Sequence, residues 1–184
     1  MLIFEIAFGL IILGLIFWLA SHLYSSIFYV PYVNSSSQAI RDALKLAKLK
    51  RGQTLLDLGC GRGDALVIAV RDFGAKAIGY EISPFPYFLA KIRSLKYPNI
   101  SVYRRDIEIA GDDIKKADVI YLYLFNSVLA RIENQIFSGL NTKTKIVSLA
   151  FMFKKHQPIK SAETQNLSIK TKVYLYKKTA RLGQ

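Results

Sequence analysis

Segments with strand patterns and segments with helix patterns alternate along most of this chain, and this alternation restricts the fold more than any other feature. Runs rich in β-branched and aromatic residues occupy 54–58, 75–81, 100–106, 117–125, 144–153 and 168–178. Runs with helical spacing of apolar residues occupy 37–53, 64–73, 83–97 and 126–140. The pattern predicts an α/β fold, a mostly parallel sheet with helices on both faces, in the doubly wound plan. We expect the last run to be an edge or hairpin strand.

The front of the chain is apolar enough to cross a membrane. Residues 6–40 contain no Asp, Glu, Lys or Arg, and residues 6–20 are almost wholly apolar. With its neighbours the segment reaches the ~20 residues that span ~30 Å of hydrocarbon. Trp18, Tyr24 and Tyr29 lie toward its end, where aromatic rings favour the membrane interface. We expect a single anchor. A cleaved signal peptide and a buried core helix are the alternatives, although no basic residue precedes the run and soluble domains seldom bury one so long.

Positive charge is confined to the rest of the chain. All 26 Lys and Arg residues lie at Arg41 or later, which predicts that the part after the anchor faces the cytoplasm. The net charge of +13 suits a domain held against an anionic membrane leaflet. Nucleic acid is the alternative partner, but no clustered basic motif with interleaved aromatic residues favours it. The single cysteine, Cys60, excludes an internal disulfide and a cysteine-based metal cluster, and we expect no metal.

We divide the chain into three parts. Residues 1–30 form the transmembrane anchor. Residues 31–52 form a linker and a leading helix, because Pro31 stops a helix and the serines after it offer an N-cap. Residues 53–184 form the remaining domain.

Acidic residues stand at the ends of three successive strands. Asp57 ends the first strand, just before the loop Gly59-Cys60-Gly61-Arg62-Gly63, and Glu81 and Asp106 end the second and third. Ligands of doubly wound sheets bind beyond the carboxyl ends of the strands. A carboxylate after the second strand suits a ribose diol, and one after the third can accept the amino hydrogens of adenine. These residues therefore predict an adenosine site.

The glycine spacing narrows the choice of ligand. The loop reads G-x-G-x-G, whereas a dinucleotide site needs G-x-G-x-x-G, and no G-x-x-x-x-G-K-[ST] motif is present for a nucleoside triphosphate. Asp57 and Asp64 flank the loop. Two carboxylates repel a pyrophosphate but attract a cationic ligand. The pattern therefore favours an adenosine ligand that carries an amino group and a sulfonium.

At this point the sequence resembles a known family. The stretch LLDLGCGRGD resembles motif I of the class I S-adenosylmethionine-dependent methyltransferases, whose fold is Rossmann-like. Together with the apolar N-terminus, the segment 31–33 and the stretches 79–95 and 124–136, it is similar to the membrane-anchored lysine methyltransferases of the ATP synthase c subunit and their prokaryotic relatives. The chain departs from that family at Asn34 and Ser35, where a proline and a threonine are usual, and at Cys60 and Arg62, where a serine and an acid are usual.

The resemblance implies S-adenosyl-L-methionine as the cofactor and a lysine of a protein, such as a membrane protein, as the methyl acceptor. The cofactor-binding residues it implies are Asp57, Gly59, Cys60, Gly61, Gly63, Glu81 and Asp106. A small-molecule or lipid methyltransferase and a non-catalytic cofactor-binding module of the same fold are the alternatives.

The acceptor side of the site is less defined by the sequence. Phe125 is placed to line an acceptor pocket, and Asn126 either orients a substrate amine or caps the following helix. His156 follows the fifth strand but is typical of a surface residue. The alternation of Tyr121 and Tyr123 predicts core positions. The sequence names no catalytic base and does not define the oligomeric state.

Overall fold

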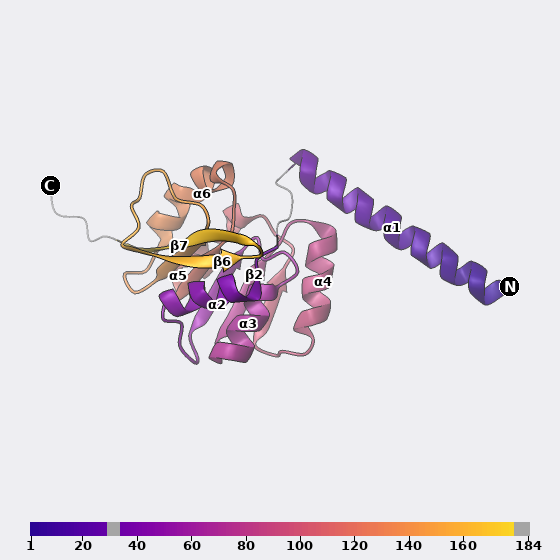
Figure 1. The fold of residues 1–184 in the computed structure, drawn as a ribbon, viewed down its shortest axis with the longest axis horizontal. Helices are drawn as coiled ribbons and strands as arrows, with labels where there is room; N and C mark the ends of the chain where they lie inside the picture. The colour runs from indigo at the N-terminus through magenta and orange to yellow at the C-terminus, as the bar shows by residue number, and fades with distance from the viewer. Residues whose placement is uncertain (29–33, 179–184) are drawn as a thin grey trace.

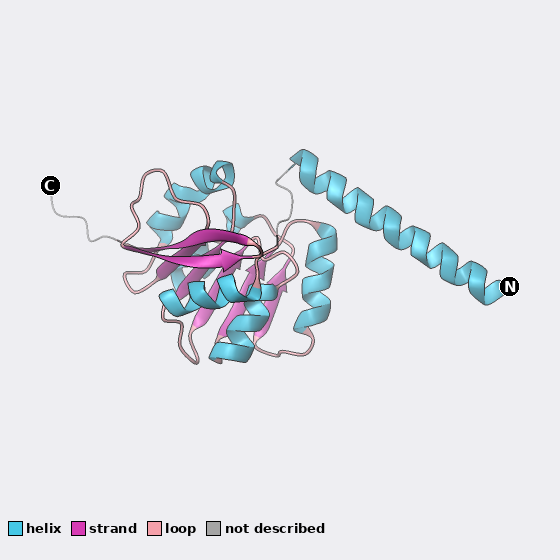
Figure 2. Ribbon diagram, in the orientation of Figure 1, coloured by secondary structure: helices cyan, strands magenta, loops and turns pink. Residues whose placement is uncertain are grey.

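The computed structural model describes residues 1–28 and 34–178, with the side chains of residues 2, 22 and 24–28 left undescribed. A twisted sheet with helices on both faces follows a separate N-terminal helix (Figures 1 and 2). The strand order is β3-β2-β1-β4-β5-β7-β6, with β1 to β5 parallel and β7 antiparallel to β5 and β6. The predicted doubly wound, mostly parallel sheet is therefore confirmed. The strands are β1 Thr54–Leu58, β2 Lys76–Tyr80, β3 Ile100–Tyr103, β4 Val119–Leu122, β5 Lys145–Leu149, β6 Lys160–Asn166 and β7 Ile169–Lys177.

Alternate residues of each central strand enter two separate cores. On one face Leu55 and Val119 pack against α2, α3 and α4, and on the other Leu56 and Ile120 pack against α5 and α6. Continuous apolar runs such as TLLDL are expected for strands covered on both faces. The helices are α2 Ser37–Leu46, α3 Asp64–Phe73, α4 Pro84–Ser94, α5 Gly111–Lys116 and α6 Asn126–Gly139, with a 3₁₀ turn η1 at Ile107–Ile109.

The sequence predicts an edge or hairpin strand for the last run, 168–178, and the hairpin alternative is confirmed, because this run is β7, which pairs antiparallel with β6. β7 lies inside the sheet beside β5, so it is not an edge strand, and the strand at that edge is β6, which the sequence did not reveal. The β6 sequence KSAETQN lacks an apolar alternation. Its inward side chains include Thr164 and Asn166, which are buried and hydrogen-bonded to Asp42 and Tyr123. Polar residues with buried partners take the place of the apolar pattern that marks a strand.

Two helix boundaries also differ from the sequence prediction. The leading helix begins as expected, with Ser36 as N-cap accepting the Ala39 N–H at 3.1 Å, but it ends at Leu46 rather than near Gly52. Gly52 instead lies in the turn before β1, at φ +79°. Asn126 is the first residue of α6 and not its cap, because Phe125 occupies the cap position without a side-chain hydrogen bond.

The N-terminal helix α1, Leu2–Phe28, extends away from the sheet (Figure 1). The span Ile3–Ser21 is long and apolar enough to cross a membrane, and none of that apolar window is buried inside the protein. The alternative of a buried core helix is therefore wrong. Near its C-terminal end α1 contacts α4, where the Phe17 and Phe85 ring centroids are 6.0 Å apart. Tyr29 and the linker residues 31–33 lie outside the described residues, and so does the side chain of Tyr24.

A buried carboxylate holds the loop between β5 and β6. Glu133 of α6 is 1% exposed and accepts the backbone N–H groups of Lys155 at 2.8 Å and His156 at 3.0 Å. Its carboxylate also bonds to the His156 Nδ1 at 2.9 Å, and the imidazole stacks on Phe137 with centroids 3.5 Å apart. Burial alone raises the pKa of Glu133, but the bonds from His156 and the amides outweigh burial and hold it below its usual value. His156 therefore secures this loop to α6.

We expect the Glu133→Gln substitution to destabilise the protein by about 1–3 kcal/mol at neutral pH, because buried amides lose a charged acceptor. The folded-state pKa of Glu133 is below its unfolded-state value of about 4.3, so the ionised carboxylate stabilises the folded protein at pH values above about 4.3. This stabilisation is lost as the pH falls through the folded-state pKa. The stability difference between the two proteins should therefore shrink below about pH 4. Denaturant unfolding of the full chain in detergent measures it.

Glu163→Gln is the matched control, since Glu163 is an exposed carboxylate on β6. A Glu133→Gln loss no larger than that of the control would contradict the assignment of Glu133 as the anchor of this loop.

Candidate functional site

The connection between β1 and α3 depends on three glycines. Gly59, Gly61 and Gly63 have φ values of +86°, +55° and +82°, which residues with a Cβ rarely adopt. A Cβ on Gly59 would also lie 2.9 Å from the Leu124 Cδ2 atom. The Gly59 and Cys60 N–H groups donate to the Tyr80 carbonyl at 2.8 and 2.9 Å, which fixes the loop to the end of β2. The glycine loop therefore lies at the carboxyl edge of the central strands.

Glu81, immediately after β2, fastens the same loop. Its carboxylate accepts the Gly61 N–H at 2.9 Å and the Ser83 N–H at 2.8 Å, one on each oxygen. The side chain is 8% exposed. Burial raises the pKa of Glu81, and the two amide bonds partly offset this effect. The Ser83 side chain also hydrogen-bonds to this carboxylate and lowers the same pKa.

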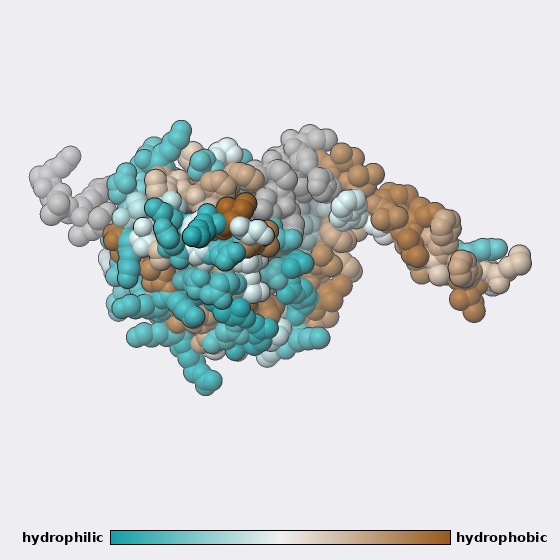
Figure 3. All heavy atoms as spheres, viewed as in Figure 1, coloured by the Kyte–Doolittle hydropathy of each residue, from teal (hydrophilic) through white to brown (hydrophobic). Residues whose placement is uncertain are grey.

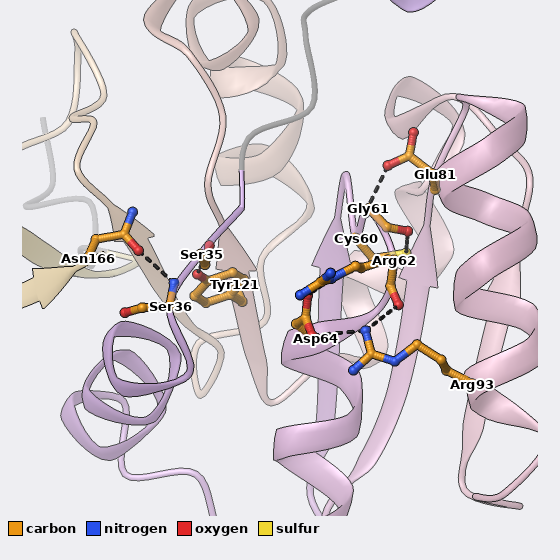
Figure 4. A network of polar contacts seen from close by, with 10 residues as sticks. All are labelled: Ser35, Ser36, Cys60, Gly61, Arg62, Asp64, Glu81, Arg93, Tyr121 and Asn166. Atoms are coloured by element: carbon orange, nitrogen blue, oxygen red, sulfur yellow. Dashed lines mark hydrogen bonds and ion pairs between the residues drawn. The ribbon is translucent and has the colours of Figure 1, made fainter. Parts of the chain in front are cut away.

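Asp57 is the carboxylate of this site that has no donor. It is 3% exposed, it lines the pocket described below, and no group in residues 1–28 or 34–178 donates a hydrogen bond to its side chain. Burial, followed by repulsion from Glu81 and Asp64, raises the pKa of Asp57 well above its usual value. Asp64 differs, because ion pairs to Arg62 at 2.6 Å and Arg93 at 2.9 Å compensate its charge (Figure 4). A cation beside Asp57 would relieve this uncompensated charge.

A pocket lies between the glycine loop and the start of α2. Its empty space, which includes the open mouth, is about 330 Å³. Of the residues expected from the sequence, Asp57, Gly59 and Cys60 line it. The sequence did not identify the remaining lining residues, which are Ser35, Ile40, Asp64, Ala65, Tyr121 and Tyr123.

Two serines ahead of α2 close one side of this pocket, and we call them the Ser35–Ser36 strap. The Tyr121 hydroxyl bonds to the Ser35 Oγ at 3.1 Å (Figure 4). The Ser36 N–H donates to the Asn166 Oδ1 at 2.6 Å, and its Oγ donates to the Gln165 carbonyl at 2.9 Å. The strap therefore joins the anchor side of the chain to β4 and to the β6–β7 hairpin.

Tyr121 of β4 is the core residue that the sequence predicted, and Tyr123, just after β4, packs against the same buried cluster. The Tyr121 ring is 3% exposed but lines the pocket with Tyr123, whose hydroxyl accepts a hydrogen bond from the Asn166 Nδ2 at 3.0 Å. Their alternation correctly predicted the core but not that both side chains also line the pocket. The hydroxyl groups of these tyrosines bond to residues far away in the sequence, so no short sequence pattern could predict those bonds.

The other candidate residues lie along the same edge but outside the pocket lining. Asp106 follows β3, and its carboxylate caps η1 by accepting the Glu108 N–H at 3.0 Å. Phe125 packs on Phe151 with centroids 5.3 Å apart, and Asn126 is exposed. Cys60, by contrast, lines the pocket; it is buried, and burial raises the pKa of its thiol, which opposes a role as nucleophile.

Comparison with protein families identifies one match that covers more than half of the chain. The model of the ANTKMT methyltransferase domain matches residues 57–160. This range includes the glycine loop, Glu81, Asp106 and the Glu133–His156 pair. It leaves out the N-terminal helix and the strap.

Three curated relatives are similar to this chain. A protein-lysine N-methyltransferase of Saccharolobus islandicus is 29% identical over 80% of this chain and 93% of its own length. The adenine nucleotide translocase lysine N-methyltransferase of Mus musculus is 27% identical over 71% of this chain, which spans 57% of that protein. The human lysine N-methyltransferase of the ATP synthase c subunit is 32% identical over 35% of this chain and 27% of its own length.

Among solved structures, an RNA methyltransferase from Salinibacter ruber in complex with S-adenosyl-L-homocysteine is similar in fold and sequence. The TM-score is 0.74 and the identity 26%, over 83% of this chain and 97% of that one. The similarity covers the sheet and its helices and supports the class of fold predicted from the sequence.

Proposed function

This chain belongs to the ANTKMT methyltransferase domain family, and we propose that it methylates a lysine of a protein at a membrane surface. It is an S-adenosyl-L-methionine-dependent methyltransferase. The observation that carries the lysine acceptor is the similarity to the archaeal protein-lysine N-methyltransferase, which extends over 93% of that protein. The two mammalian relatives are also named as lysine methyltransferases.

The residues of the site fit this cofactor, which supplies a methyl group on a positively charged sulfur. Asp57, which is buried and has no donor among residues 1–28 and 34–178, is suited to the cationic amino acid part of the ligand, and a cation would lower its raised pKa. We assign Glu81 to the ribose hydroxyls and Asp106 to the adenine amino group. We assign Gly59, Cys60, Gly61 and Gly63 to backbone contacts, since the positive φ values of the glycines leave no side chain over the loop.

Aromatic side chains beyond β4 and β5 suit the acceptor. Tyr123 and Phe125 both pack on Phe151, with centroids 6.1 and 5.3 Å apart. A lysine among such rings is desolvated, which lowers its pKa and favours the neutral amine that attacks a methyl group. We assign Phe125 to the wall of the acceptor site and Asn126 to orienting the amine through its amide oxygen. Desolvation and alignment supply the rate without a dedicated base.

We propose that α1 crosses the membrane with the domain on the cytoplasmic side. Three features support this: the apolar span Ile3–Ser21, its exposure, and the absence of Lys and Arg before Arg41. In this proposal residues 1–30 are the anchor, 31–52 the linker and leading helix, and 53–184 the catalytic domain. An anchor raises the effective concentration of a membrane-protein acceptor without adding a contact. The relatives' named acceptors, adenine nucleotide translocase and the ATP synthase c subunit, are membrane proteins.

Incubation of the full chain with source membranes and methyl-labelled cofactor should place the label on protein as methyl-lysine, because the proposed acceptor is a lysine near the bilayer. Amino-acid analysis of the labelled protein identifies the modified residue. A matched reaction uses the chain without residues 1–30, which should leave the membranes on washing and label their proteins more slowly.

Label recovered in lipid, in a small molecule or in RNA would overturn the lysine acceptor while leaving the methyltransferase itself in place. RNA is included because of the Salinibacter ruber structure and the net charge of +13. Continued membrane association of the shortened chain would overturn the single anchor.

We expect Glu81→Ala to weaken binding of S-adenosyl-L-methionine by about 1.5–3 kcal/mol, the range for a lost charge-assisted hydrogen bond. Calorimetric titration of the full chain in detergent measures the affinity, with Glu163→Ala as the exposed control. Thermal unfolding of the variant without ligand shows whether the affinity falls only because the glycine loop has lost its hydrogen bond to Glu81. An unchanged affinity would mean that other groups hold the ribose.

Tyr121→Phe should weaken cofactor binding by about 0.5–1.5 kcal/mol, because the Ser35–Ser36 strap loses its hydrogen bond to β4. The same titration measures it. Tyr103→Phe is the matched control, since Tyr103 is a 41% exposed tyrosine on the edge strand β3. Equal affinities of the two variants would show that the strap does not contribute to the pocket.

A further inference from the structure

One side of α4 carries a row of exposed apolar side chains. Phe88, Ile92 and Leu95 are 53%, 48% and 83% exposed. They are spaced four and three residues apart, so they lie on one face at successive turns of the helix. The opposite face is in the core, where Ala90 is 2% exposed. We call this row the α4 stripe.

The α4 stripe continues the contact between the domain and the apolar helix. Phe85 stands three residues before Phe88, on the same face of α4. Its ring packs edge-on against Phe17 of α1 at 6.0 Å, and its N–H donates to the Ser21 Oγ at 3.0 Å. Figure 1 shows α1 leaving the domain from the side on which α4 lies, and Figure 3 shows apolar surface on α1 and also at the edge of the domain on that side. The stripe therefore begins where the membrane span Ile3–Ser21 ends.

The segment that carries the stripe has charges of one sign, and the acid that reaches it from a neighbouring helix is Asp64 of α3, which pairs with Arg93 at 2.9 Å. Residues 82–105, which include α4 and the edge strand β3, contain no Asp or Glu. The five basic residues of this stretch are Lys91, Arg93, Lys96, Arg104 and Arg105. Lys91 and Lys96 are exposed beside the stripe and form no ion pair within the described part of the chain. A basic apolar face of this kind complements an anionic lipid surface.

We propose that the α4 stripe lies on the anionic surface of the same membrane that α1 crosses. The inference rests on the membrane anchor proposed above. Phe88, Ile92 and Leu95 enter the boundary between headgroups and acyl chains, and Lys91 and Lys96 reach the lipid phosphates. A second copy of the chain fits this face less well, because a symmetric contact would bring the same basic stretch against itself.

Attachment to the membrane through both α1 and α4 would fix the orientation of the domain relative to the bilayer, which α1 alone does not fix. A helix followed by a linker allows the domain to rotate above the bilayer, whereas a second contact along α4 fixes which side of the domain faces the lipid. The pocket then lies at a constant height above the membrane. This arrangement restricts the acceptors to lysines presented at that height.

The proposal can be tested with an environment-sensitive fluorophore on the full chain in lipid nanodiscs. The dye is attached to Phe88→Cys or Leu95→Cys, and Ile159→Cys is the matched control, since Ile159 is 52% exposed just before β6 at the far edge of the sheet. Cys60 is 7% exposed, so the unsubstituted chain reports background labelling. We expect lipid-borne nitroxides to quench the α4 dyes severalfold more than the control dye, and aqueous iodide to do the reverse.

A second measurement tests the charge contribution. Lys91→Glu with Lys96→Glu should reduce lipid quenching of the α4 dyes severalfold in phosphatidylglycerol-rich discs, and Lys160→Glu with Lys170→Glu should leave it unchanged. Raising the salt from about 0.1 M to about 1 M should act in the same direction, because the screening length falls from ~10 Å to ~3 Å.

The outcomes separate this proposal from the anchor. If the chain stays in the discs but iodide reaches the α4 dyes as freely as the control, the α4 contact is overturned and the anchor stands. If both quenchers are excluded from the α4 dyes, a protein surface covers the stripe and the lipid contact is overturned. If the chain leaves the discs on washing, the anchor and the α4 contact are overturned together, while methyl transfer in detergent still tests the enzyme.

Discussion

The hydrogen bond from the Gly61 N–H to the Glu81 carboxylate is the interaction on which the site depends. It joins the loop after β1 to the end of β2, two neighbouring strands whose carboxyl ends meet at one edge of the sheet. The loop reaches that carboxylate because its glycines adopt positive φ, where a Cβ would be strained. Burial raises the pKa of Glu81, and the backbone amides that donate to its two oxygens partly offset this effect. The glycine loop and Glu81 therefore hold each other at this edge of the sheet.

The same edge connects the pocket to the membrane side of the chain. The Ser35–Ser36 strap follows the undescribed residues 29–33 and bonds to Tyr121 and Asn166, and α1 contacts α4 through Phe17 and Phe85. The segment that leads out of the proposed anchor is therefore part of the pocket wall and not a passive tether.

Much of the fold and the glycine loop could be predicted from the sequence, since both leave local signals. Apolar strands, helical spacing and a glycine at alternate positions are properties of short stretches. The edge strand β6 and the pocket tyrosines left no such signal. Thr164, Asn166 and Tyr121 are ordinary polar or aromatic residues whose roles arise from partners 122, 130 and 86 positions away. Only the folded chain brings those pairs together.

His156 illustrates the same limit for a candidate catalytic residue. A histidine after the fifth strand is compatible with chemistry, and nothing near it in the sequence indicates that Glu133 is its partner. The carboxylate lies 23 positions earlier, on α6, and a buried acid in a helix is easily taken for an exposed one. Its three amide contacts and the Phe137 stack assign the pair to structure.

The net charge of +13 is not spread evenly over the domain, because acidic and basic residues are concentrated in different segments. The site holds Asp57, Asp64 and Glu81 close enough for their charges to raise the pKa of Asp57, whereas the next 24 residues, 82–105, hold no acid at all. A uniformly basic domain would repel a cationic cofactor as strongly as it attracts an anionic membrane. Separation of the two signs, acids behind the glycine loop and cations on the neighbouring helix, allows one small domain to bind both. In the arrangement we propose, the change of sign after Glu81 separates the surface that faces the ligand from the surface that faces the lipid, and the Arg93–Asp64 ion pair joins the two.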